Sequence, residues 1–191
     1  MKKILMAAAA LMLIMTIVVP ITSCSKNTDT MEIVINLDSI VIKPYLNFGT
    51  PLADVEKYMA ENYADYADEN PDSLEYIELD GGGLWSKYYK KEKCWISFFF
   101  VDADGKDLTL VNYDFFFPIQ FDAVMAELER NGFTNMGEVE FENDNSDLSY
   151  LFLSPDESIE ATPFYWEKDG GSWAITFQPT NDFDLQHLVN R

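Results

Sequence analysis

An unbroken apolar run near the N-terminus decides how much of this chain remains to fold into a domain. The run covers residues 4–21, follows two lysines, and is interrupted only by Thr16 and the late Pro20. Its length of about eighteen residues suits a transmembrane helix. A basic start, an apolar stretch and small residues at its end are also the order of a secretory signal peptide, and Pro20 disfavours a continuing helix. Two expectations therefore stand: a cleaved signal peptide, which the pattern favours, and an uncleaved membrane anchor.

Residues 21–24 (Ile-Thr-Ser-Cys) close the run with small residues and a cysteine. Together with the basic start and the apolar stretch, they resemble the signal peptide and lipobox of bacterial lipoproteins. The resemblance implies that residues 1–23 are removed, that Cys24 is lipidated, and that residues 24–31 tether the chain to a membrane. Ser25 follows the cysteine, which in the sorting rules of these lipoproteins implies the outer membrane. Whether the domain faces the periplasm or the cell exterior stays open.

Length and charge bound the remaining chain. Removing 23 of 191 residues leaves 168, which suffice for a single domain, expected over residues 32–191. The two N-terminal lysines leave with the signal, so 11 basic and 33 acidic residues give a formal charge of −22. Such a charge repels nucleic acid and anionic lipid headgroups, and it suits a cationic partner or simple solubility. Cys94 becomes the only free thiol; its apolar surroundings predict a buried, inert side chain and exclude an intrachain disulfide.

The first half of the domain predicts a helix among strands. Thr50 is a suitable N-cap and Pro51 a suitable first residue for a helix. Its apolar residues Leu52, Val55, Met59 and Tyr63 share one face. The other expected elements are strands at 33–38, 76–79, 84–89, 94–101 and 108–113, an acidic loop at 65–73, a bend or bulge at Gly81-Gly82-Gly83, and a hairpin turn at Asp104-Gly105.

The second half repeats this plan. Phe121, Val124, Met125 and Leu128 recur at helical spacing, and Asn131-Gly132 is a natural stop. The other expected elements are strands near 139–141 and 150–153, a last hairpin of 164–166 with 173–177 around Asp169-Gly170, and a helical turn in the tail at 182–191.

The two halves align with each other. At an offset of 65 residues, Phe99-Phe100-Val101-Asp102 corresponds to Phe164-Tyr165-Trp166-Glu167, and the two helices align at an offset of 69. This favours a duplicated α-β-β-β unit over residues 48–113 and 117–178, although any two helices followed by Asp-Gly hairpins share such features. The predicted fold is α+β, with an antiparallel sheet and two helices on one face.

A helix opened by Gly49-Thr50-Pro51, with Val55 one turn on, precedes the antiparallel strands. This pattern resembles a group that comprises the β-lactamase inhibitory proteins and the small lipoprotein of the outer-membrane β-barrel assembly machine. In the inhibitors the α-β-β-β unit is duplicated. The whole chain also looks like acidic, aromatic-rich lipoproteins of gut Bacteroidetes. The resemblance covers residues 48–178 as a pattern; it implies an assembly factor or inhibitor and assigns no residue a role.

The sequence offers no catalytic constellation. His187 is the single histidine, whereas zinc hydrolase patterns need two, and no Gly-x-Ser-x-Gly elbow occurs. Gly81-Gly82-Gly83 lacks the spacing and the lysine of a phosphate-binding loop. We therefore predict no catalytic residue, no cofactor and no enzymatic activity. A hydrolase that uses paired carboxylates is the weakest alternative, because 33 acidic residues make chance pairs unavoidable.

Two acidic loops are candidate calcium-binding sites. Asp102, Asp104 and Asp107 alternate around Gly105, as in part of an oxygen-ligand loop, and residues 142–147 form a second cluster. An EF-hand ends in a glutamate twelve residues on and lies between helices. Here position 113 is a tyrosine within a strand pattern. A hairpin turn and a solvated loop are therefore preferred, with weak calcium sites as the alternative and no metal site predicted.

Aromatic residues give the best indication of a binding surface. In the run 98–100, successive phenylalanine rings must point to opposite faces of a strand, so the face without helices also carries rings. Three alternatives stay open for that face: coverage by the protein itself, a protein partner, or a glycan. The sequence favours an envelope lipoprotein that binds another protein, with a carbohydrate-binding lipoprotein as the alternative. The candidate surface residues are Trp85, Trp95, Tyr165 and Trp166.

Overall fold

A computed structural model describes residues 32–37, 40–79, 82–116, 121–140, 146–167 and 171–180. Several sequence expectations lie outside these residues: the signal segment, the lipidated Cys24 and its tether, residues 142–145 of the second acidic cluster, the Asp169-Gly170 turn, and His187 with the tail. No helix in the described ranges combines the length and the apolar composition that a membrane crossing requires.

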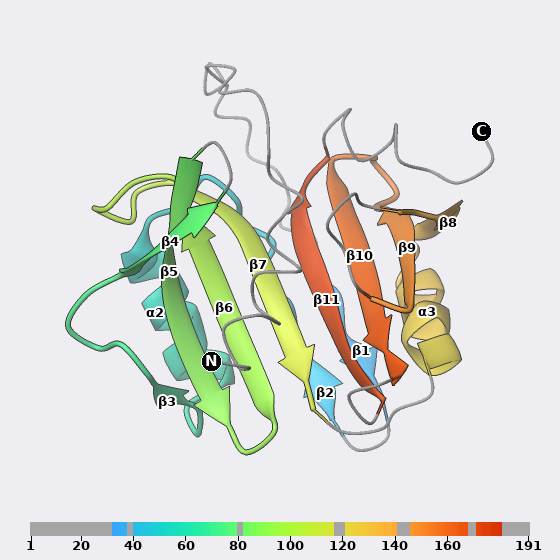
Figure 1. The fold of residues 1–191 in the computed structure, drawn as a ribbon, viewed down its shortest axis with the longest axis horizontal. Coiled ribbons are helices and arrows are strands. Elements are labelled where there is room, and N and C mark those ends of the chain that lie inside the picture. Colours follow the sequence, from blue (N-terminus) through green and yellow to red (C-terminus); the bar gives the residue numbers. More distant parts are fainter. Residues whose placement is uncertain are drawn as a thin grey trace.

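Strands dominate the described chain, and nine of them form one antiparallel sheet (Figure 1). The order across the sheet is β3-β5-β6-β7-β11-β10-β9-β8, β4 also pairs with β5, and β1 and β2 pair separately. The predicted α+β class is confirmed. In chain order the elements are β1 (Ile35–Asn36), β2 (Val41–Ile42), α2 (Leu52–Asn62), β3 (Ala67–Asp68), β4 (Glu75–Leu79), β5 (Gly82–Lys91), β6 (Cys94–Phe100), β7 (Leu108–Phe115), α3 (Phe121–Arg130), β8 (Thr134–Glu138), β9 (Leu148–Leu153), β10 (Ile159–Trp166) and β11 (Ser172–Pro179).

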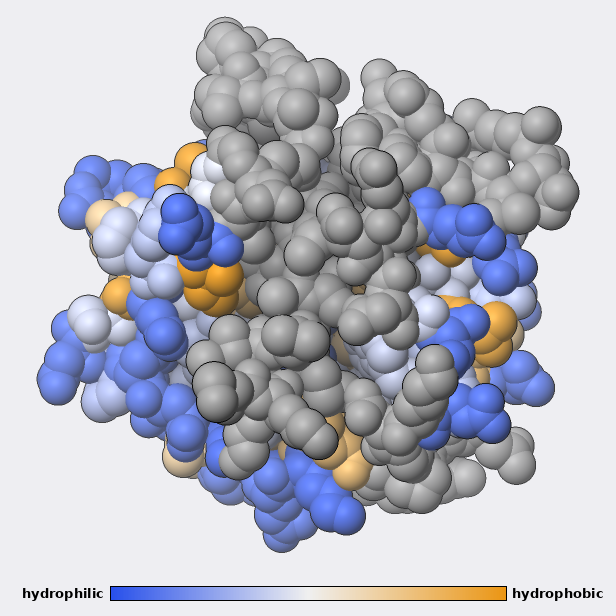
Figure 2. All heavy atoms as spheres, in the orientation of Figure 1, coloured by the Kyte–Doolittle hydropathy of each residue, from blue (hydrophilic) through white to orange (hydrophobic). Residues whose placement is uncertain are grey.

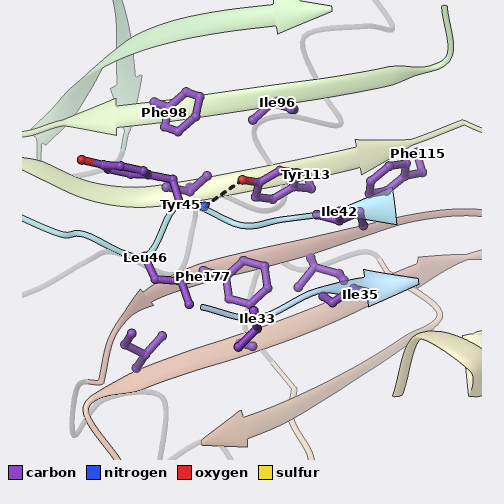
Figure 3. Close-up of a cluster of buried hydrophobic side chains, with 14 of the residues drawn as sticks. Ile33, Ile35, Ile42, Tyr45, Leu46, Ile96, Phe98, Tyr113, Phe115 and Phe177 are labelled. Carbon is purple, nitrogen blue, oxygen red and sulfur yellow. Dashed lines mark hydrogen bonds between the residues drawn. The ribbon is translucent and has the colours of Figure 1, made fainter. Parts of the chain in front are cut away.

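One face of the sheet packs against α2, α3 and the β1–β2 segment. Figure 1 shows α2 behind β5 and β6, α3 behind β9, and β1 and β2 between the helices. Val55 of α2 and Leu128 of α3 are fully buried in one apolar cluster with side chains of the sheet. Figure 3 shows the centre of this cluster, where the Tyr113 hydroxyl accepts a hydrogen bond from the Tyr45 backbone N–H at 3.1 Å. The largest apolar surface of the sheet is thus removed from water.

The N-terminal segment contributes to this core as its alternation predicts. Ile33, Ile35 and Leu37 are buried, while Val34 and Asn36 are exposed. The segment does not join the large sheet, because its two-residue strand β1 pairs with β2. Its apolar side chains therefore belong to the main core, where Ile33 and Ile35 lie near Phe177 (Figure 3).

The opposite face of the sheet combines a small apolar cluster with a polar row. Phe99 packs there with Leu84 and Leu110, whereas its neighbours Phe98 and Phe100 belong to the main core, so the predicted alternation is confirmed. Polar side chains lie at one level of four adjacent strands, and all are buried. They are Ser97 (β6), Asn112 (β7), Thr176 (β11) and Thr162 (β10).

Two local expectations need correction. Helix α2 begins at Leu52 with Pro51 as its N-cap and without a side-chain cap, because the Thr50 hydroxyl instead donates to the Asn47 carbonyl and bonds the Tyr45 hydroxyl. The expected break at the glycines is absent at Gly82 and Gly83, which are strand residues of β5.

The strand expected near 139–141 begins earlier than predicted: Val139 bonds to Ser149 of β9, and residue 141 lies outside the described residues. Strand β8 covers Thr134–Glu138, where the sequence lacks apolar alternation, and its pairing with β9 shifts register between Asn135 and Gly137. The predicted stop of α3 is confirmed, since the helix ends at Arg130 and Gly132, two residues on, adopts a φ of 88°.

Candidate functional site

An acidic margin lies along one side of the sheet. Residues 51–79, which form α2, β3, β4 and their connections, carry nine carboxylates and one basic residue, Lys57. Figure 2 shows mostly hydrophilic residues on the left of the view, where Figure 1 places these elements. The margin therefore concentrates negative charge on exposed positions of adjacent elements. All nine residues are exposed: Asp54, Glu56, Glu61, Asp65, Asp68, Glu69, Asp72, Glu75 and Glu78.

A buried lysine connects this acidic margin to the sheet. Lys87 of β5 points toward α2, and its side chain is 2% exposed. Its ammonium lies 2.8 Å from Asp68 Oδ2, 2.9 Å from the Asn70 carbonyl oxygen and 3.9 Å from Glu56 Oε1. Because a buried cation requires such partners, Lys87 ties α2 and the 68–71 segment to the sheet.

The side chain of Asn70 takes the place of a strand beside β5. Its Nδ2 donates to the Ser86 carbonyl at 2.9 Å, and its Oδ1 accepts the Tyr88 N–H at 3.0 Å. These bonds fill the gap between β4, which pairs with residues 82–86, and β3, which pairs with residues 89–90. The outer side of β5 is thereby closed over its length.

Tyr76 is the most exposed aromatic ring of the described chain. It lies on β4 among Glu75 and Glu78, is 51% exposed, and packs against Trp85 with a centroid separation of 5.1 Å and an interplanar angle of 53°. Its ring covers Gly83 on β5: a Cβ there would lie 2.4 Å from Tyr76 Cζ. The ring thus packs on Gly83 and Trp85 while about half of its surface stays open to solvent.

The four aromatic residues predicted as a binding surface are distributed over both faces. Trp85 and Tyr165 lie on the face that packs against the helices and contact the main core. On the opposite face, Trp166 is buried and stacks on Phe164. These positions do not form one continuous patch.

Trp95 also lies on the opposite face, and it is half-buried. Its ring packs edge-on against Phe116 with centroids 5.9 Å apart. The Lys90 ammonium lies 4.8 Å from the centroid of the Trp95 ring, within the range of a cation–π contact. Trp85, through its contact with Tyr76, is the one member of the predicted set that reaches the acidic margin.

Sequence reasoning missed Tyr76 because it ranked tryptophans and aromatic runs first. A usable signal was nevertheless present: glycines stand in the second strand of a short hairpin whose first strand carries an aromatic residue, and the Tyr76 ring reaches diagonally to Gly83. Such glycines leave room for the ring to lie across the neighbouring strand.

The three calcium candidates form a turn. Asp102 Oδ1 accepts backbone N–H groups of Asp104 at 2.9 Å and of Lys106 at 3.3 Å. The Asp104 carboxylate pairs with the Lys106 ammonium at 2.5 Å, and this hydrogen bond lowers the pKa of Asp104. Gly105 adopts a φ of 61°, as the turn requires, and Asp107 follows it before β7. Within the described ranges, no three metal-ligating side chains converge.

One buried carboxyl lies away from the margin. Asp114 of β7 is buried on the face opposite the helices, and burial raises its pKa to about 7 while a hydrogen bond from Asn112 acts in the other direction. Asn112 Oδ1 in turn accepts a hydrogen bond from Thr176 Oγ1 at 2.9 Å. On the other face, Cys94 is buried and burial raises the pKa of its thiol, which disfavours the reactive thiolate.

Comparisons of the chain with protein-family models, with curated protein sequences and with solved structures found no match. The site is therefore interpreted from its own residues. It offers a dense negative charge and one half-exposed ring that packs on Gly83 and Trp85.

Proposed function

We propose that this chain is a cell-envelope lipoprotein, anchored to the outer membrane through Cys24, that acts as a non-enzymatic protein-binding module of the assembly-factor or inhibitor type. The observation that carries the proposal is the half-exposed Tyr76 ring, held on Gly83 and Trp85 inside the acidic margin. The lipidation of Cys24 rests on the lipobox resemblance.

Tyr76 has the properties of an interface hot spot. Tyrosine is enriched at such positions because its large ring buries much area at a small entropic cost. Here the ring already packs on Gly83 and Trp85 before binding, which reduces the part of that cost that comes from ordering the side chain. The surrounding carboxylates attract a basic partner and speed its approach.

The strand order supports the duplicated unit that the resemblance to the inhibitory proteins implies. The strand order is symmetric about the β7–β11 pair. On one side of this pair lie β6 and then β5, and on the other side lie β10 and then β9. Strand β6 (94–100) corresponds to β10 (159–166) at an offset of 65, and β7 (108–115) corresponds to β11 (172–179) at an offset of 64. The register shift between β6 and β7 skips Thr109, which accounts for the change of one residue. We include tandem units, each a helix followed by antiparallel strands, in the proposal.

A glycan is the second candidate ligand. The tilted rings of Tyr76 and Trp85 lie on the same face of the sheet as Glu78, and sugars bind through aromatic faces together with polar hydrogen-bonding groups. In that case binding is insensitive to the sign of the nearby charge and persists at high salt.

Two experiments test the proposal. First, Cys24→Ser is expected to abolish incorporation of a labelled fatty acid and to release the protein from the membrane fraction. Second, the full chain in mild detergent serves as bait in native envelope extract, with bound proteins read by mass spectrometry. We expect a stoichiometric protein that Tyr76→Ala loses and that moderate salt weakens.

Matched variants on the opposite margin provide the controls. Met136→Ala also removes an exposed apolar side chain, and Glu138→Lys makes the same charge change as Glu78→Lys. Both control variants are expected to retain the partner, whereas Glu78→Lys loses it. Equal capture by all four variants would overturn the role of the acidic margin, and labelled lipid on the Cys24→Ser variant would overturn the anchor.

A further inference from the structure

Among the described residues, no strand pairs with the outer edge of strand β4. It pairs with β5 from Glu75↔Ser86 to Leu79↔Gly82 and lies off the main path of the sheet. No backbone group among the described residues hydrogen-bonds to its other side. An exposed strand edge presents N–H and C=O groups that accept an additional strand.

The other margins of the described sheet are closed to such an addition. The side chain of Asn70 and strand β3 fill the remaining outer side of β5. Strand β8 at the far margin has a register shift at Gly137, whose φ is 120°. A bulge of this kind twists an edge away from regular pairing. Strand β4 has neither a bulge nor a proline nor a lysine to protect it.

The negative charge on and beside β4 favours a basic segment as the added strand. Glu75 and Glu78 are exposed on the strand, and Asp72 precedes it. None of the three carboxylates has an ion pair in the described part of the chain. A second copy of this chain, with a formal charge of −20, would bring like charges together, which disfavours self-pairing. Basic side chains opposite these carboxylates would instead be favourable.

Alternation along β4 gives each face one acidic and one apolar position. Tyr76 and Glu78 lie on one face, while Glu75 and Ile77 lie on the other. On the basis of the proposed protein-binding function, we propose that the outer edge of β4 accepts an extended segment of the partner as an added strand, in which lysine or arginine alternates with apolar residues. Tyr76 then packs against an apolar side chain of that strand, and the backbone bonds supply the rest of the contact.

The test uses the full chain in mild detergent and defined peptides. The first peptide alternates lysine and valine over about nine residues, enough for one strand. The second has the same sequence, but the backbone nitrogens that face β4 are methylated, which removes strand pairing and keeps the charge. Isothermal titration is expected to give at least about tenfold weaker binding for the methylated peptide. The first peptide is also expected to slow amide hydrogen exchange in β4.

Variants locate the peptide and separate the two proposals. Glu78→Lys is expected to weaken the lysine–valine peptide about tenfold, and Glu138→Lys to leave it unchanged. Equal affinity for both peptides, or no binding of either, overturns strand addition; partner capture that still depends on Tyr76 then leaves the protein-binding function standing. If, in addition, Tyr76→Ala captures the envelope partner normally, the protein-binding role of this margin is overturned as well.

Discussion

The ring of Tyr76 on β4 lies directly over Gly83 on β5. A Cβ atom at position 83 would be 2.4 Å from both Cζ and Oη of Tyr76 and 2.5 Å from the backbone oxygen of Ile77. The first two contacts involve a side chain that could rotate away, but the third involves backbone. Gly83 is therefore required by the close approach of the two strands and by the resting position of the ring.

Gly83→Ala is expected to separate β4 from β5 locally and to lower the free energy of unfolding by about 1–3 kcal/mol, as overpacking does. It should also move Tyr76 and weaken binding at the acidic margin. Gly82→Ala is the matched control, because a Cβ there meets nothing within 4 Å. Urea denaturation and peptide titration check both effects; equal stability of the two variants would contradict the packing of Tyr76 on Gly83.

Lys87→Met is expected to lower the free energy of unfolding by about 2–4 kcal/mol, because it leaves Asp68 and the Asn70 carbonyl without the buried ammonium. Lys91→Met on the same strand is the control: its pair with Asp65 is exposed, so little change is expected. Urea denaturation of both variants at low and at high salt measures the difference. A Lys87 variant as stable as the Lys91 variant would show that the internal ion pair does not hold the margin.

Asn70→Ala is expected to expose the outer side of β5 at one place. The Tyr88 N–H and the Ser86 carbonyl lose their partners, at a cost of about 1–3 kcal/mol. Hydrogen exchange should therefore speed up at the Tyr88 amide while exchange within β6 changes little. Unchanged protection at Tyr88 would contradict the strand-like role of the Asn70 side chain.

Stability is expected to depend on pH through Asp114. Its pKa in the fold is about 7, above the usual value of 3.8, so the folded protein binds the proton more tightly than the unfolded chain. The resulting stabilisation is fully present below about pH 4 and is lost as the pH rises through about 7, a change of about 2–4 kcal/mol.

The Asp114→Asn variant isolates this contribution, because other carboxyl groups such as Glu127 have a lowered pKa and act in the opposite direction. We expect the difference in unfolding free energy between wild type and Asp114→Asn to shift in favour of the variant between pH 4 and pH 8. A difference that stays constant over this range would mean that the Asp114 carboxyl is ionised throughout.

Much of the fold was predictable because its signals are local. Alternation places Phe98 and Phe99 on opposite faces of β6, and helical spacing buries Val124 and Leu128. Gly132 ends α3 as its backbone freedom predicts. Thr50 failed as an N-cap because its hydroxyl bonds a nearby carbonyl and a tyrosine, a choice that the local pattern leaves open.

The candidate site was less predictable. Trp85 was identified from its residue type, but its neighbour Tyr76 was not, since the exposure of that ring depends on how β4 lies across β5. Trp166 has the same type of side chain as Trp85, yet it is buried. Residue type alone does not distinguish a ring in the core from a ring at a surface.

The sequence by itself determined the periodic elements, the turns and the strongly negative charge, because these follow from neighbouring residues and from composition. The tertiary structure decided which strands meet at β7–β11, where Thr176 donates to Asn112 across 64 residues of chain. It also decided that Lys87 is buried beside Asp68 and that Tyr76 covers Gly83. Such contacts form only when segments that are distant in the sequence pack together, so the pattern of neighbouring residues does not predict them.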